Sequence, residues 1–199
     1  MMTIEKFVHE LEYATCDITD CSQFIRFCRE CDVECAHGAS RLCAVFPKEK
    51  KVLKIVRNDV CRDYCEMEAD YYRKAQELGI AEMLLPIELY AVIGDNVRVY
   101  IQPMYTYAVE NLPYKVQKSL SAKYGKATHS KVYRKICRGF FGDCPSSVWL
   151  GAAITLYGKK SMRQLEQWTK DNRINDLHSG NCGFLNGKPI LLDYGGYFG

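Results

Sequence analysis

The chain has 199 residues, of which 48% are hydrophobic and 26% charged, and its formal net charge is +3. This composition is typical of a folded globular protein and excludes a largely disordered chain. The longest apolar runs fall far short of the roughly 20 residues that cross a bilayer, and the N-terminus lacks a basic-then-apolar signal pattern. We therefore expect a cytoplasmic protein without membrane contact.

The N-terminal part is predicted to be helical over residues 3–35, with a polar break where Thr19 or Asp20 caps a second helix. The next stretch, ASRLCAVFPKEKKVLKIV, holds two β-rich runs, Leu42–Phe46 and Val52–Val56. A Pro-led charged turn joins these runs, which predicts a β-hairpin.

Four of the eleven cysteines form a dense group within the predicted helices: Cys21, Cys28, Cys31 and Cys35. Without a secretion signal we expect reduced thiols rather than disulfides. The spacing of the four follows one helical face that Ile25 shares, so one interpretation is a set of small buried side chains. The alternative is a zinc site, for which only one Cys-x-x-Cys pair is present.

A third helix is predicted after the hairpin, in the segment VCRDYCEMEADYYRKAQELGI. Its stripe at helical spacing includes one charged residue and consists of Cys61, Cys65, Glu68, Tyr72 and Ala75. Gly79 is placed to end the helix. The segment PIELYAVIGDNVRVYIQPM then predicts two more strands around a Gly94–Asp95–Asn96 turn. The first half is thus predicted as a mostly antiparallel sheet with one helix between two hairpins.

The second half begins with a basic segment after a predicted lobe boundary near Pro103–Tyr107. Residues 111–142 carry eight Lys or Arg and no Asp or Glu, so the rest of the chain nets −5. Such a segment is either a solvated basic surface or a site for an anionic partner. Two helices are predicted beyond it, at Ser146–Tyr157 and Ser161–Thr169.

The chain ends with a predicted hairpin whose two-residue turn is Asn186–Gly187. The register of such a hairpin pairs Asn181 with Leu192 and places Asp193 beside them. Two hard oxygen ligands at one end of a ribbon suit Mg²⁺, and Asp176 lies on the loop that enters the same pocket. The alternative is a polar turn that only caps and solvates the hairpin.

Lys54 is predicted to lie on the face of its strand that Val52 and Val56 share. A cation on an apolar face needs a partner, and Glu68 on the following helix is the best-phased carboxylate, with Glu66 as the alternative. A lysine held by a carboxylate is a typical phosphate ligand. Alternatively, Lys54 is an edge-strand charge that discourages aggregation.

The motifs VLKIV, EMEAD, DLHSGN and DYG occur in the order in which protein kinases and their relatives carry their catalytic parts. The final motif is similar to the catalytic loops of aminoglycoside and choline kinases. It most resembles the small early Ser/Thr protein kinases of T7-like bacteriophages, over roughly Gly38 to Gly195.

The resemblance implies an α+β, two-lobed protein-kinase-like fold with a truncated C-lobe. Its parts are an N-terminal helical extension (1–35), an N-lobe of antiparallel sheet plus helix (36–104) and a minimal, mostly helical C-lobe (105–199). The C-lobe would contain the basic segment 111–142 and the catalytic loop and hairpin 174–195.

The resemblance also implies roles for individual residues. Asp176 would orient the attacking hydroxyl or accept its proton, while Asn181 and Asp193 would hold Mg²⁺ on the phosphates of ATP. Lys54, paired with Glu68, would fix the α- and β-phosphates. The remaining nucleotide contacts would come from the phosphate-loop residues Gly38 and Ser40 and from the adenine-binding segment at Gln102 and Met104.

The sequence departs from the family in three places. The stretch AHGASR has one glycine where a Gly-rich phosphate loop is usual, and Ile174–Asn175 stand where His-Arg is common. Only four residues follow Gly195, so peptide recognition would come from elsewhere, with the basic segment 111–142 as the candidate.

We therefore expect ATP- and Mg²⁺-dependent phosphoryl transfer to protein Ser/Thr hydroxyls by a phage-encoded or bacterial kinase in the host cytoplasm. One alternative is a kinase-fold pseudokinase, a binding module that binds and inhibits a host protein. A second is a small-molecule kinase of the aminoglycoside type. Nucleic-acid binding without a nucleotide site is a further alternative.

Overall fold

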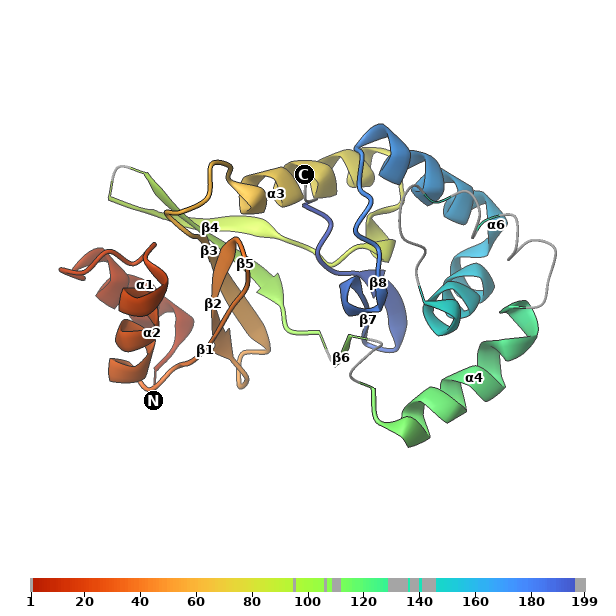
Figure 1. Cartoon of the computed structure of the whole chain (residues 1–199), viewed down its shortest axis with the longest axis horizontal. Helices are drawn as coiled ribbons and strands as arrows, with labels where there is room; N and C mark the ends of the chain where they lie inside the picture. Colours follow the sequence, from red (N-terminus) through yellow and green to blue (C-terminus); the bar gives the residue numbers. More distant parts are fainter. Residues whose placement is uncertain are drawn as a thin grey trace. The chain divides into compact units, whose positions relative to one another are not determined.

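The structure is a computed structural model that describes residues 2–94, 96–105, 107–108, 112–128, 136, 140 and 146–195. It confirms the predicted α+β class, with antiparallel sheets and α-helices (Figure 1). The chain divides into two compact units: unit 1 comprises Met1–Asp70 and Pro86–Met104, and unit 2 comprises Tyr71–Leu85 and Tyr105–Gly199. No helix in the described part of the chain is long and apolar enough to cross a membrane.

Unit 1 contains a five-stranded antiparallel sheet in the order β1-β2-β3-β5-β4. Both predicted hairpins are present, because β2 pairs with β3 and β4 pairs with β5. The strands are β1 (Glu34–His37), β2 (Arg41–Phe46), β3 (Lys51–Val56), β4 (Glu88–Ile93) and β5 (Val97–Pro103).

Two helices, α1 (Ile4–Glu12) and α2 (Cys21–Glu30), precede this sheet. The side chain of Asp20 accepts a hydrogen bond from the Gln23 N–H and caps α2, as predicted. Apolar side chains of both helices form one core cluster with one face of the sheet, including Phe7, Phe24 and Leu53. This core fixes the strands that carry the opposite, more polar face.

The prediction that the helical region extends to Cys35 is wrong. Helix α2 ends at Glu30, Asp32 adopts a left-handed φ of 55°, and the Val33 N–H donates to the Cys28 carbonyl. These are the features of a helix C-cap that turns the chain away. The following residues form the edge strand β1, which pairs with β2.

The dense cysteine group lies in this first unit. Cys28 is fully buried in the core cluster, and Cys21, Cys31 and Cys35 are partly buried against it. Burial, followed by the neighbouring Cys35, raises the pKa of the Cys28 thiol. Among the described residues, no group of three or more His, Cys, Asp or Glu side chains is placed to hold a metal ion. The positions of these cysteines favour the core interpretation over zinc.

Helix α3 (Tyr64–Glu77) begins three residues after the predicted stripe begins at Cys61. It ends near Gly79, whose φ of 70° is the left-handed conformation that glycine adopts at low cost. Glu68 and Ala75 are fully buried, so the predicted buried stripe is present at these positions.

Unit 2 contains α4 (Tyr114–Thr128) and α6 (Ser147–Asp171), which pack against each other. The two helices predicted from Ser146 onward are parts of α6, which is kinked at Gly158 (φ 76°, ψ 171°). A three-stranded antiparallel sheet completes the unit: β6 (Tyr107–Ala108), β7 (Cys182–Leu185) and β8 (Lys188–Leu191). Helix α4 accounts for most of the described part of the basic segment, and most of the segment's remaining residues lie outside the described ranges.

Candidate functional site

The hairpin β7–β8 forms with the predicted turn and register. Asn186 and Gly187 have φ values of 51° and 77°, as a type I′ turn requires. Cys182 is paired with Leu191, and the Leu192 N–H donates to the Asn181 carbonyl over 2.9 Å. Asn181 therefore lies beside Leu192, and Asp193 follows directly.

Asn181 and Asp176 are in direct contact in unit 2. The Asn181 Nδ2 donates to the Asp176 carbonyl oxygen over 2.8 Å and to its Oδ2 over 3.2 Å. The short 3-10 helix η3 (Ser179–Asn181) supplies the turn that brings the two residues together. Because Nδ2 faces Asp176, the amide oxygen Oδ1 is the end of the Asn181 side chain left to act as a metal ligand.

His178 contacts Asp176 from the other side. Its Nδ1 accepts a hydrogen bond from the Gly180 N–H over 2.9 Å, so a neutral imidazole here carries its proton on Nε2. That Nε2 lies 3.5 Å from Asp176 Oδ1. The two carboxylate oxygens of Asp176 thus face different neighbours, which restricts rotation of the group.

The residue after Asp193 anchors this end of the ribbon. Tyr194 is fully buried, its hydroxyl donates to the Leu85 carbonyl over 2.6 Å, and its ring packs edge-on against Trp168 with centroids 5.9 Å apart. On the other side, Leu192 is held by Asn181. The backbone of Asp193 is therefore fixed by both of its neighbours, while its own side chain is half-buried.

Lys54 and Glu68 form the predicted pair in unit 1. The Lys54 Nζ lies 3.2 Å from Glu68 Oε2, and both side chains are at least nine-tenths buried. Glu66 instead contacts Arg98, with a separation of 2.8 Å between Arg98 Nη1 and Glu66 Oε2. Of the two carboxylates that the sequence offered, Glu68 is the partner of Lys54.

Arg41 is a second cation on Glu68 and was not among the site residues predicted from the sequence. Its Nη2 lies 3.6 Å from Glu68 Oε2, the oxygen that Lys54 also contacts, and the Arg41 residue is only 7% exposed. The signal was the hairpin register, because Arg41 is opposite Val56 and so shares the Lys54 face of the sheet. The surroundings of this cluster have low polarity. Burial raises the pKa of the neighbouring Cys65 thiol to about 12, although the charges of Arg41 and Lys54 act to lower it.

The β1–β2 turn is held by hydrogen bonds to Gly38. The Gly38 N–H donates to the Arg41 carbonyl over 2.9 Å, and Arg57 Nη1 donates to the Gly38 carbonyl over 3.1 Å. Ser40 is buried at 4% exposure. The backbone donor of Gly38 is thus already used within the hairpin.

The predicted adenine-binding residues lie at the end of β5. The Met104 N–H donates to the Lys50 carbonyl over 2.8 Å, while the Met104 side chain is exposed. Gln102 is 3% exposed, and within the described structure its Oε1 has no hydrogen-bond partner. Gln102 therefore offers a buried acceptor, whereas the N–H of Met104 is already engaged.

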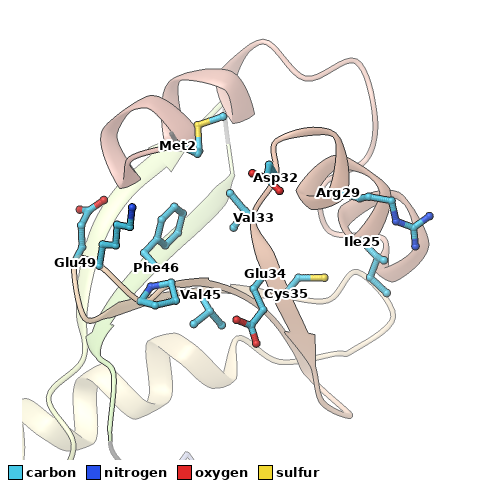
Figure 2. Close-up of a pocket in the computed structure, with 12 residues that line it drawn as sticks. Met2, Ile25, Arg29, Asp32, Val33, Glu34, Cys35, Val45, Phe46 and Glu49 are labelled. Atoms are coloured by element: carbon cyan, nitrogen blue, oxygen red, sulfur yellow. The ribbon is translucent and has the colours of Figure 1, made fainter.

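Unit 1 also has a cavity of about 640 Å³ that none of the predicted catalytic, nucleotide-binding or Mg²⁺-binding residues lines. Figure 2 shows it among helix α2, strand β1 and the turn after β2. Its lining combines apolar side chains such as Val33 and Phe46 with the carboxylates of Asp32, Glu34 and Glu49. One carboxylate oxygen of Glu49 already has a structural partner, because Oε1 accepts a hydrogen bond from the Ile4 N–H at the start of α1.

A scan against models of protein families finds no match for this chain, and neither do searches of the curated proteins and of the solved structures. The function is therefore inferred from side-chain geometry. That geometry consists of two groups, each within one unit: Lys54, Glu68 and Arg41 in unit 1, and Asp176 and Asn181 followed in register by Asp193 in unit 2.

Proposed function

We propose that this chain is an ATP- and Mg²⁺-dependent kinase of two-lobed, protein-kinase-like fold that transfers the γ-phosphoryl group to Ser or Thr hydroxyls of proteins. The observation that carries the proposal is the contact of Asn181 with Asp176 at the end of a ribbon that also presents Asp193. Phosphoryl transfer needs mainly positioning and charge neutralisation, and these groups are suited to both.

The unit 2 residues have two different roles in this proposal, proton acceptance and metal binding. Asp176 is an acceptor for the proton of the attacking hydroxyl, and its contacts with Asn181 and His178 support a fixed orientation. The Asn181 Oδ1 and the Asp193 carboxylate are hard oxygen ligands of the number that Mg²⁺ commonly takes from a protein. Bound Mg²⁺ would neutralise phosphate charge during transfer.

The unit 1 residues bind the nucleotide in this proposal. Lys54 would contact phosphate oxygens, and Glu68 would hold the ammonium in place. Gln102, with its buried acceptor oxygen, would receive a hydrogen bond from the adenine amino group.

Transfer of labelled γ-phosphate to the chain itself or to proteins of a host-cell extract tests the activity. The Asp176→Asn variant is expected to reduce labelling by about 10²- to 10⁴-fold, the usual contribution of a positioned acid or base. The matched control is Asp171→Asn, which changes an exposed carboxylate that accepts a hydrogen bond from Gln167. Equal labelling by wild type and Asp176→Asn would contradict the role of Asp176.

A second candidate is a pseudokinase that binds and inhibits a host protein through the basic segment 111–142. The tight β1–β2 turn favours it, because the Gly38 donor is not available to a phosphate. The two candidates differ in turnover. Binding of MgATP at about 100 times its Kd adds about 2.7 kcal/mol to the free energy of unfolding, and such binding without phosphoryl transfer would favour the second candidate.

A further inference from the structure

We infer that Arg41 is a second phosphate ligand, which acts with Lys54 in place of the backbone donors of a glycine-rich loop. The inference rests on the proposed function and names a residue that the predicted site did not include. It follows from the shape of the β1–β2 turn, from the placement of Arg41 and from the charges around Glu68.

One backbone donor of the turn, the Gly38 N–H, is already used within the hairpin. The turn connects β1 and β2. Within it the Gly38 N–H donates to the Arg41 carbonyl, and Arg57 Nη1 donates to the Gly38 carbonyl. A phosphate beside this turn cannot use that N–H, so a side-chain donor would replace it. The first side chain of β2 is Arg41, which directly follows the turn.

Arg41 points to the face of the sheet that carries Lys54. Cys43 is opposite Lys54 and Arg41 is opposite Val56, so alternate residues place both cations on one face. The Arg41 Nη2 also lies 3.5 Å from the Tyr64 carbonyl at the start of α3, and its guanidinium carbon lies 5.9 Å from the centre of the Tyr64 ring. These contacts restrict the guanidinium to the neighbourhood of Glu68.

Two cations therefore meet at one carboxylate oxygen, Glu68 Oε2, at 3.2 Å and 3.6 Å. Holding an ammonium and a guanidinium together in a desolvated place is unfavourable, and an added anion lowers that cost. Because a guanidinium has five N–H donors, Arg41 can contact Glu68 and a phosphate oxygen at the same time. Its planar fork also matches phosphate geometry better than an ammonium does.

The consequence is that charge, rather than backbone donors, would distinguish ATP from an uncharged nucleoside. Equilibrium binding of MgATP and of adenosine to the full-length chain tests this in wild type and in Arg41→Gln. We expect the variant to bind MgATP about 10- to 100-fold more weakly, as for the loss of one charge-assisted hydrogen bond, and to bind adenosine within about 2-fold of wild type.

The matched control is Arg98→Gln. Arg98 lies on the same face of the sheet but contacts Glu66 and Asp63, at 2.8 Å and 3.8 Å, instead of Glu68. We expect it to leave the affinities for both ligands within about 2-fold of wild type, since surface ion pairs contribute little.

Arg41→Lys keeps the positive charge and removes the planar guanidinium group. It is expected to weaken MgATP binding about 3- to 10-fold with adenosine unchanged, and it decides the question if Arg41→Gln does not fold. Equal losses for MgATP and adenosine would assign Arg41 a structural role, and unchanged MgATP binding would remove it from the site. Either result overturns the inference alone, whereas a wild type that binds no MgATP overturns the proposed function as well.

Discussion

Asn181 holds Asp176 at two points, through hydrogen bonds from one amide nitrogen to the carbonyl oxygen and to the carboxylate of Asp176. The arrangement links the loop before η3 to the end of the hairpin, because the Asn181 carbonyl also receives the Leu192 N–H. One residue thus connects the proposed proton acceptor with the segment that follows β8 and contains Asp193. Its side-chain oxygen is left for the proposed Mg²⁺.

Asn181→Ala removes both the contact with Asp176 and the proposed metal ligand. We expect the Mg²⁺ concentration at half-maximal phosphoryl transfer to rise by about 10-fold or more, the effect of losing one ligand-shell partner. Measuring transfer rates across a Mg²⁺ series checks this. Asn175→Ala is the control, because Asn175 is exposed and adjacent to Asp176. An unchanged Mg²⁺ dependence in Asn181→Ala would remove Asn181 from the metal site.

Glu68→Gln tests the buried charge cluster of unit 1. The change keeps the shape of the side chain but leaves the charges of Lys54 and Arg41 without their shared carboxylate. We expect the free energy of unfolding to fall by about 3 kcal/mol, as for a buried ion pair that loses one partner. Urea denaturation measures the change.

Glu66→Gln provides the comparison for that experiment. Glu66 is paired with Arg98, and both side chains are more than two-fifths exposed, so we expect a loss of no more than about 1 kcal/mol. Similar losses in the two variants would show that Glu68 does not hold the cluster together.

Local patterns were enough to predict several contacts in each of the two side-chain groups. The alternation in β3 and the helical phase of Glu68 predicted the pair of Lys54 with Glu68. The Asn186–Gly187 turn predicted the register that places Asn181 beside Leu192. In each case short-range geometry determines the contact, since strand pairing and helix phase fix which side chains share a face.

The contacts that were missed depend on longer-range packing or on weak local signals. Strand β1 is only four residues, three of them exposed, so it lacks the alternating burial that marks a strand in sequence. The contact of Tyr194 with Leu85 joins residues 109 positions apart, which no local pattern encodes. Predicting the contact of Arg41 with Glu68 would have required both the strand register and the reach of a long side chain across to α3.

The buried thiol of Cys182 predicts a loss of stability at alkaline pH. Burial raises its pKa from 9.0 to about 12, so between these values the unfolded chain has lost a proton that the folded chain retains. The free energy of unfolding therefore falls with rising pH in this range, by up to about 1.4 kcal/mol per pH unit from this thiol.

Cys182→Ala isolates that contribution. Its unfolding free energy should fall less steeply than that of wild type, by about 1 kcal/mol between about pH 9.5 and pH 10.5. Below about pH 8 the Cys182 thiol is protonated in both the folded and the unfolded chain. The unfolding free energies of the variant and of wild type should therefore show parallel pH dependence there. Denaturant titrations at each pH measure the slopes, and identical slopes above pH 9 would contradict a buried, protonated thiol.

Cys43 can report nucleotide binding without any mutation. It is half-buried and directly opposite Lys54, so a phosphate held by Lys54 would lie next to its thiol. We expect MgATP to slow alkylation of Cys43 in the native protein, measured peptide by peptide by mass spectrometry over time. Cys61, which is exposed, serves as the internal control and should react at the same rate with and without the nucleotide. Equal alkylation rates of Cys43 at saturating MgATP would place the phosphates away from β3, even if the chain binds ATP.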